Sequence, residues 1–270
     1  KFQFDATQQY QLDAIAAIAD IFKGQQRRSV QYSVMTGGED VGTLPGFDQL
    51  GGNVGNVLGI TEAEMRSNVR EIQARNQIAD AAANTELAHW VIDDPINSLP
   101  RACPHFTVEM ETGTGKTYVY LRTIMELAKK YGYRKFVIVV PSVAIREGTL
   151  KSIEQTKEHL LTLYNEPVQS FVYDSKDPLR LRQFATSNFV EIMVINIHAF
   201  VRGYQQDPSG DGDDSGNVIY RRIDKLSGKR PIDFVQAARP ILIIDEPQSV
   251  DGTEKSKDAL MQMNPLCTLR

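Results

Sequence analysis

The stretch FTVEMETGTGKT, from Phe106 to Thr117, leads from an apolar run through a glycine-rich turn into a helical pattern. The apolar run from Phe106 to Met110 predicts a strand, and the apolar spacing from Gly115 to Tyr131 predicts a helix. Glycines let backbone N–H groups close around phosphates, and a helix N-terminus presents its positive end to the same anions. The order of strand, loop and helix therefore predicts a phosphate-binding loop rather than a merely tight glycine turn.

The residue types in this loop suit ATP and Mg²⁺. Lys116 is expected to reach the β- and γ-phosphates, and Thr117 is expected to coordinate Mg²⁺. The standard pattern has glycine six residues before the lysine, whereas this chain has Met110 there, and this departure weakens the pattern taken by itself. Besides Lys116 and Thr117, the residues expected to surround the nucleotide are Thr112, Gly113, Thr114 and Gly115.

A second chemical site follows the apolar run of residues 241–244, as the tetrapeptide DEPQ from Asp245 to Gln248. A carboxylate at the carboxyl end of a parallel strand faces the crevice where such sheets bind ligands. Asp245 is therefore expected to hold the Mg²⁺ that Thr117 also touches, and Glu246 to orient or deprotonate the attacking water. Taken alone, the acidic pair could be an ordinary surface feature, and the phosphate loop upstream favours the catalytic interpretation.

From His105 onward, apolar runs alternate with helical patterns, which predicts a doubly wound α/β fold with a mostly parallel sheet and helices on both faces. The predicted strands cover residues 106–110, 136–140, 168–173, 191–195 and 241–244. The predicted helices of this part cover residues 115–131, 144–164 and 178–187. An amphipathic helix is also predicted from Thr7 to Lys23, with Gly24 as its stop, and residues 24–104 are interpreted as an insertion before the phosphate loop.

The predicted insertion differs in composition from the rest of the chain. Residues 36–59 are rich in glycine and predict loops or short hairpins. Residues 61–90 predict a polar helical stretch, in which Thr61 and Glu64 have the spacing of a reciprocal capping box.

Composition limits the class of protein. The 30 Lys and Arg against 34 Asp and Glu give a net charge of −4, so any contact with nucleic acid must be local. The two cysteines, Cys103 and Cys267, are too few for a disulfide framework and are expected to be buried or incidental thiols. No run approaches the roughly 18 apolar residues of a membrane span, and the first residues lack the order of a signal peptide. We expect a soluble, cytoplasmic protein that does not bind a membrane.

An acidic, glycine-rich segment at residues 205–217 is the single low-complexity piece of the sequence. It resembles the opening of a calcium loop from Asp211, but the twelfth position is Arg222, where a bidentate Glu is required. We therefore expect a flexible, solvated loop rather than a calcium site.

Three segments together resemble one protein family: the loop METGTGKT, the tetrapeptide DEPQ, and FVIVVPSVAIR from Phe136 to Arg146. This combination is similar to the restriction (Res) subunit of type III restriction enzymes, within superfamily-two helicases. The likeness covers most of residues 1–23 and 104–250. It implies an N-terminal RecA-like motor domain that acts on double-stranded DNA with a methyltransferase (modification) subunit as partner.

The resemblance also implies roles for single residues. Gln11 takes the position of a glutamine that reads the adenine edge, although it could be a solvated helix residue. Ser142 and Arg146 take positions that contact the DNA backbone, although Ser142 could serve as a helix cap, and both can hold. Gln248 would couple hydrolysis to the rest of the motor. His198 follows another strand near the DNA path and is as often structural.

The resemblance further implies a second RecA-like domain and a nuclease domain, neither of which this sequence encodes. We therefore expect a fragment spanning residues 1–270 of a motor, weak or inactive as an ATPase by itself and without a nuclease site. Two alternatives stay open. One is the same domain in another superfamily-two DNA or RNA helicase or translocase, and the other is a nucleotide-binding module that does not hydrolyse ATP.

Overall fold

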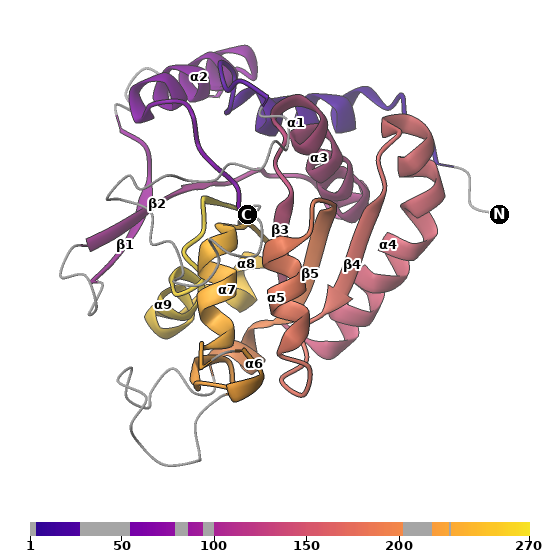
Figure 1. Cartoon of the computed structure of the whole chain (residues 1–270). Helices are drawn as coiled ribbons and strands as arrows, with labels where there is room; N and C mark the ends of the chain where they lie inside the picture. The colour runs from indigo at the N-terminus through magenta and orange to yellow at the C-terminus, as the bar shows by residue number, and fades with distance from the viewer. Residues whose placement is uncertain (1–3, 28–54, 79–85, 94–99, 202–217, 227) are drawn as a thin grey trace.

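The computed structural model describes residues 4–27, 55–78, 86–93, 100–201, 218–226 and 228–270 (Figure 1). The predicted acidic loop at 205–217, with its calcium-like pattern from Asp211, lies outside these residues, as does most of the loop region predicted at 36–59. In the described part, no helix has the length and apolarity required to cross a bilayer.

The described strands form one seven-stranded sheet in the order β1-β2-β7-β6-β3-β5-β4. All neighbouring pairs are parallel except β1 and β2. The strand bounds are β1 His89–Asp93, β2 Pro100–Phe106, β3 Lys135–Val140, β4 Val168–Val172, β5 Val190–Asn196, β6 Ile241–Ile244 and β7 Cys267–Leu269. Because the six later strands are parallel, the loops that follow them meet at one edge of the sheet.

The helices cover both faces of this sheet. Their bounds are α1 Gln9–Asp20, α2 Glu62–Arg75, α3 Lys116–Tyr131, α4 Val143–Tyr164, α5 Leu179–Thr186, α6 Ile197–Val201, α7 Pro231–Ala238, α8 Pro247–Val250 and α9 Glu254–Met261. Two single-turn 3₁₀ helices are η1 Val218–Tyr220 and η2 Asp224–Leu226. The fold class is therefore the predicted α/β class with a mostly parallel sheet.

Alternation along the central strands explains why the protein has two apolar layers. In β3, Phe136 and Ile138 pack with α1 to α4, whereas Val137 and Val139 pack with α5, α6, α7 and α9. Every residue of β3 and of β6 is buried, as strands covered on both faces require. The continuous apolar runs in the sequence therefore predicted these strands correctly.

The strand before the phosphate loop was misplaced by the sequence prediction. The structure has β2 at 100–106 instead of a strand at 106–110, because β2 pairs antiparallel with β1, a strand that was not predicted. Beyond Phe106 the chain still bonds to β7, since Val108 N donates to Arg270 O at 2.8 Å. The predicted start of the αβ pattern at His105 is therefore wrong, because β1 and β2 belong to the same sheet.

The helical stretch predicted for residues 61–90 is also partly wrong. Helix α2 ends at Arg75, and the stretch continues into β1, where Trp90 is buried and Val91 is 60% exposed. That two-residue alternation is the period of a strand, and it was too short to recognise. The predicted capping box is confirmed, since the Thr61 side chain accepts from Glu64 N while the Glu64 carboxylate accepts from Thr61 N.

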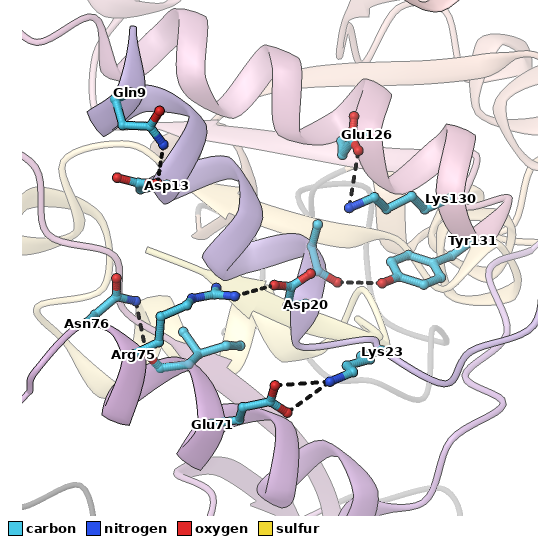
Figure 2. Close-up of polar contacts among 12 residues, drawn as sticks. Gln9, Asp13, Asp20, Lys23, Glu71, Arg75, Asn76, Glu126, Lys130 and Tyr131 are labelled. Carbon is cyan, nitrogen blue, oxygen red and sulfur yellow. Dashed lines mark hydrogen bonds and ion pairs between the residues drawn. The ribbon is translucent and has the colours of Figure 1, made fainter. Parts of the chain in front are cut away.

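Helix α2 lies against α1, the predicted N-terminal helix (Figure 1). Figure 2 shows two ion pairs beside this contact: Arg75 of α2 pairs with Asp20, the last residue of α1, at 2.8 Å, and Lys23, just after α1, pairs with Glu71 at 3.0 Å. Both pairs are partly exposed, so the shared apolar contacts of the two helices contribute more to their packing than the pairs do. Helix α1 is anchored in turn to α3, because the Tyr131 hydroxyl donates to the carbonyl of residue 19 at 2.8 Å.

Candidate nucleotide and magnesium site

The phosphate loop has the backbone conformation that its glycines permit. Gly113 and Gly115 both have φ near +82°, a left-handed conformation that side chains rarely adopt, and Gly115 caps the N-terminus of α3. A Cβ at Gly115 would lie 3.0 Å from Gln11 Nε2, whereas a Cβ at Gly113 would meet no described atom within 4 Å. Gly115 is therefore required by conformation and by space, and Gly113 by conformation.

Gln11 lies against this loop, and the adenine-reading role that the resemblance implies for it stays a prediction. Its Nε2 donates to the Thr114 carbonyl at 2.9 Å, and the Tyr10 hydroxyl approaches the same carbonyl at 3.4 Å. Gln11 is 6% exposed, so it is not a solvated helix residue, and its Oε1 lacks a hydrogen-bond partner among the described residues. The side chain therefore has an acceptor atom with unused bonding capacity beside the loop.

Lys116 and Thr117 open α3 at the end of the loop. Lys116 is exposed, and no hydrogen bond or ion pair joins it to another described residue, although its ammonium lies close enough to Asp245 to lower the pKa of that carboxyl. Thr117, the next residue, is half-buried. An unpaired lysine at a helix N-terminus with two left-handed glycines is an arrangement that fits a phosphate chain.

Asp245 emerges at the end of β6, where its backbone N–H donates to the Val139 carbonyl at 3.0 Å. Burial raises the pKa of the Asp245 carboxyl, the neighbouring charge of Glu246 raises it further, and the ammonium of Lys116 opposes both. The structure thus places the predicted Mg²⁺ ligand within electrostatic reach of the predicted phosphate ligand. A poorly solvated carboxylate in this position favours a nearby cation.

Glu246 has a left-handed backbone, with φ 54° and ψ 63°, although it is not a glycine. Such a conformation costs about 1 kcal/mol and is concentrated at functional sites. Glu246 caps α8, and its carbonyl accepts from Ser249 N at 2.9 Å. Glu246 and Gln248 are both exposed, so their side chains are accessible at the edge of the sheet.

Tyr120 also belongs to this site, although it was not among the predicted site residues. Its side chain is 9% exposed and faces Thr117, Thr149 and Asp245. Burial, followed by the charge of Asp245, raises the pKa of the Tyr120 phenol to about 12, so it stays neutral at physiological pH. Its spacing of four residues from Lys116 places it on the same side of α3 and was the signal available in the sequence.

A cavity of about 1230 Å³ opens beside the loop, on the side of α1. Tyr10 and Asp13 line it from α1, Arg70 and Gln73 from α2, and residues 110–114 from the loop. It has room for the base and sugar of a nucleotide whose phosphates lie on the loop. The part of the chain interpreted as an insertion therefore supplies one wall of this cavity.

The predicted DNA contacts lie together at the start of α4, but both side chains are engaged within the chain. Ser142 caps α4 by accepting from Ile145 N at 3.3 Å, and Arg146 binds the carboxylate of Glu147 at 2.8 Å. His198 is exposed on α6. The capping role of Ser142 is confirmed, and contact with DNA stays a prediction for Ser142 and Arg146.

Other metal chemistry finds no support in the described ranges, which contain no group of three or more His, Cys, Asp and Glu able to hold a metal ion. Mg²⁺ in a phosphate site needs few protein ligands, because phosphates and water complete its coordination shell.

Both cysteines are buried, as predicted, and burial raises the pKa of the Cys103 thiol to about 12.

A mostly parallel sheet with a glycine loop after one strand and Asp-Glu after another defines the RecA-like class of P-loop domains. A family model described as "Type III restriction enzyme, res subunit" matches residues 70–264. The chain belongs to this family, whose members are helicase-like ATPase components of restriction systems.

Three similar proteins are named as Res subunits of type III restriction-modification enzymes. The chain is 28% identical over 232 residues to the EcoP15I Res subunit of Escherichia coli, covering 79% of this chain and 21% of that protein. It is 28% identical over 225 residues to the EcoPI Res subunit of Escherichia phage P1, with the same two coverages. It is 30% identical over 181 residues to the StyLTI Res subunit of Salmonella typhimurium, covering 60% and 17%. The chain spans about a fifth of the length of these relatives.

Proposed function

We propose that this chain binds and hydrolyses ATP as the first RecA-like motor domain of a DNA-translocating type III restriction subunit. The observation that carries the proposal is the convergence of Lys116, Thr117 and Asp245, from the start of α3 and the end of β6, at one edge of the sheet. Mg²⁺ held there with the nucleotide would neutralise phosphate charge.

Each predicted residue has a place in this proposal. Lys116 binds the β- and γ-phosphates, Thr117 and Asp245 hold the metal, and Glu246 orients the attacking water. Gln11 reads the adenine edge with Oε1, the acceptor atom that has no hydrogen-bond partner among the described residues. Gln248 couples ATP hydrolysis at this site to the rest of the motor.

The proposed partners are double-stranded DNA and a modification methyltransferase, in the cytoplasm. The three relatives are named as parts of type III restriction-modification enzymes, which supports this choice over another superfamily-two helicase. The net charge of −4 restricts DNA binding to a local surface, for which the start of α4 is the candidate. Arg146 would exchange its contact with Glu147 for a DNA phosphate.

Calorimetry of ATP binding to this chain, with and without Mg²⁺, tests the proposal. Lys116→Ala should weaken binding by roughly 10- to 100-fold, because a charge-assisted hydrogen bond to phosphate is lost. Lys151→Ala, which removes an exposed lysine of α4, should bind as the unchanged chain does. Equal affinity of the Lys116 variant and the unchanged chain, or no binding by either, would overturn the assignment.

Phosphate release, measured with and without duplex DNA, separates a motor from a passive nucleotide-binding module. Glu246→Gln should keep ATP binding and lose whatever release the unchanged chain shows, because the group that orients water is altered. Release that continues undiminished in this variant would exclude Glu246 from the reaction.

A further inference from the structure

Tyr120 presents an unsatisfied polar group beside the two proposed magnesium ligands, Thr117 and Asp245. It lies on α3, one turn after Lys116, and its hydroxyl is buried with no hydrogen bond of good geometry to any described residue. A buried hydroxyl without a partner is uncommon and requires an explanation. Its neighbours are the side chains of Thr117, Thr149 and Asp245.

The hydrogen-bonding capacities of these neighbours restrict what the hydroxyl can do. A phenol has one proton to donate and can also accept, a threonine hydroxyl can do both, and an ionised carboxylate only accepts. A threonine that gives a lone pair to a metal still has its own proton to donate. All three groups are used if the Thr117 hydroxyl donates to the Tyr120 hydroxyl and the Tyr120 hydroxyl donates to the Asp245 carboxylate.

We infer that Tyr120 is a positioning residue that joins the two proposed magnesium ligands, accepting a hydrogen bond from Thr117 and donating one to the Asp245 carboxylate. Groups that orient metal ligands in this way act as strongly on metal affinity as some of the ligands themselves. The inference rests on the proposed function, because it requires Thr117 and Asp245 to hold Mg²⁺. It assigns Tyr120 no contact with nucleotide.

Thr149 offers the competing explanation. It is 3% exposed on α4 and could be the single partner of the Tyr120 hydroxyl, as an ordinary contact within the core. In that case loss of the hydroxyl would change stability and leave the dependence of nucleotide binding on Mg²⁺ unaltered. The two explanations therefore predict different results for one measurable ratio, the affinity for ATP with Mg²⁺ divided by the affinity in excess chelator.

Tyr120→Phe removes the hydroxyl and keeps the ring, and Tyr133→Phe is its matched control. Tyr133 follows α3, is 2% exposed, and likewise has a hydroxyl without a described partner, but its ring packs against Phe22, in another part of the core. In calorimetry on the whole chain, Tyr120→Phe should reduce the Mg²⁺ ratio by about tenfold. Its affinity in chelator, and the ratio of the Tyr133 variant, should stay within about twofold of the unchanged chain.

A double-mutant cycle assigns the effect to Asp245. In an Asp245→Asn background the Tyr120→Phe change should have little further effect, because the carboxylate that the phenol orients is absent. An unchanged Mg²⁺ ratio in Tyr120→Phe, or an equal reduction in both backgrounds, would overturn the inference. If Lys116→Ala binds ATP normally, the proposed function fails first, and the inference fails with it.

A measurement on the unaltered side chain guards against a folding defect in Tyr120→Phe. With tyrosine labelled by ¹³C at the ζ carbon, Mg²⁺ added to the ATP-bound chain should shift the Tyr120 signal. The shift should disappear in Asp245→Asn. A Tyr120 signal that does not respond to Mg²⁺ would contradict the positioning role even if the phenylalanine variant cannot be folded.

Discussion

Lys135 is a lysine with no exposed surface, at the start of β3 and at the opposite edge of the sheet from the nucleotide site. Its ammonium donates to the Ser187 carbonyl and lies 5.5 Å from the ring of Phe184. Burial lowers the pKa of Lys135 to about 7, Glu191 opposes this, and Arg134 and Arg180 add to it. A side chain that is normally charged is therefore close to half-protonated near neutral pH.

A folded-state pKa below the unfolded one means that the unfolded chain binds more protons between about pH 7 and 10, so stability from this group rises with pH there. Relative to Lys135→Met, the unchanged chain should gain roughly 2 kcal/mol of unfolding free energy between pH 7 and 9. Urea denaturation of both proteins at each pH measures the difference.

The matched control for this titration is Lys151→Met, which replaces an exposed lysine of α4 and should show no such change with pH. Parallel pH profiles for the unchanged chain and Lys135→Met would mean that the buried amine does not titrate in this range. Only the slope is decisive, because the variant also loses the hydrogen bond to Ser187.

Single residues of the site differ in how far the sequence reveals them. The positions of Lys116 and Asp245 at one edge of the sheet could be predicted, because each occupies a fixed place in a short motif after a parallel strand, and their roles stay predictions. Tyr120 was harder to predict, because its spacing from Lys116 places it on the same side of α3 but does not show which side chains of α4 and of the chain after β6 face it. The conformation of Glu246 likewise follows from the turn between β6 and α8 and not from its residue type.

At the scale of elements, helix α2 should be sensitive to its first residue. Thr61 satisfies a backbone N–H of the first turn, and this turn would otherwise lose a bond. Thr61→Ala should lower the unfolding free energy by about 1 kcal/mol. Ser67→Ala, an exposed position within α2, should be neutral or slightly stabilising, since alanine is the better helix former.

Thermal unfolding of both α2 variants compares the two positions directly. Equal stabilities would show that α2 is held by its contacts with α1 alone, without help from the cap. Those contacts include the Asn68 amide, which donates to the carbonyls of Ile21 and Lys23 at 3.0 and 2.8 Å.

Elements were predictable where the apolar pattern was complete within one segment. Strand β6 has the predicted bounds, and α3 begins one residue after its predicted start, because a strand buried on both faces and a helix with buried apolar residues at helical spacing leave strong signals in the sequence. Strand β7, only Cys267–Leu269, has no such pattern and was missed. Its position in the sheet depends on pairing with β2 and β6, which are distant in the sequence, so local residue propensities do not predict it.

At the scale of the whole molecule, the short strand β7 connects the two strands that lead to the candidate site. It lies between β2, which leads to the phosphate loop, and β6, which leads to Asp245, so it sets the spacing of the two halves of the site. Directly after it, Arg270 bonds through its backbone to Phe106 and Val108, and its guanidinium pairs with Asp251 at 3.1 Å. Arg270 therefore ties the segment after Asp245 to the strand before the loop.

The pair between Arg270 and Asp251 yields a prediction with a defined dependence on pH. Asp251 has 4% of its side chain exposed, whereas Arg270 has 26%. Burial raises the pKa of Asp251, and the charge of Arg270 lowers it. In Arg270→Met the carboxylate loses its partner, its folded-state pKa rises further above the unfolded value, and the ionised form destabilises the fold at pH 7 by about 2 kcal/mol.

Protonation of Asp251 removes the destabilising effect of an unpaired buried carboxylate. The difference in unfolding free energy between Arg270→Met and the unchanged chain should therefore shrink as pH falls from 7 toward 4. The double variant Asp251→Asn/Arg270→Met should recover part of the loss at pH 7, because no charge stays buried. Lys257→Met removes another nearby positive charge, but Lys257 already pairs with Glu254, so its effect should stay below about 0.5 kcal/mol. Urea denaturation across this pH range decides the matter: a loss in Arg270→Met that is constant with pH would assign Arg270 to packing alone. A loss that fades in acid would show that the ion pair between Arg270 and Asp251 itself stabilises the fold.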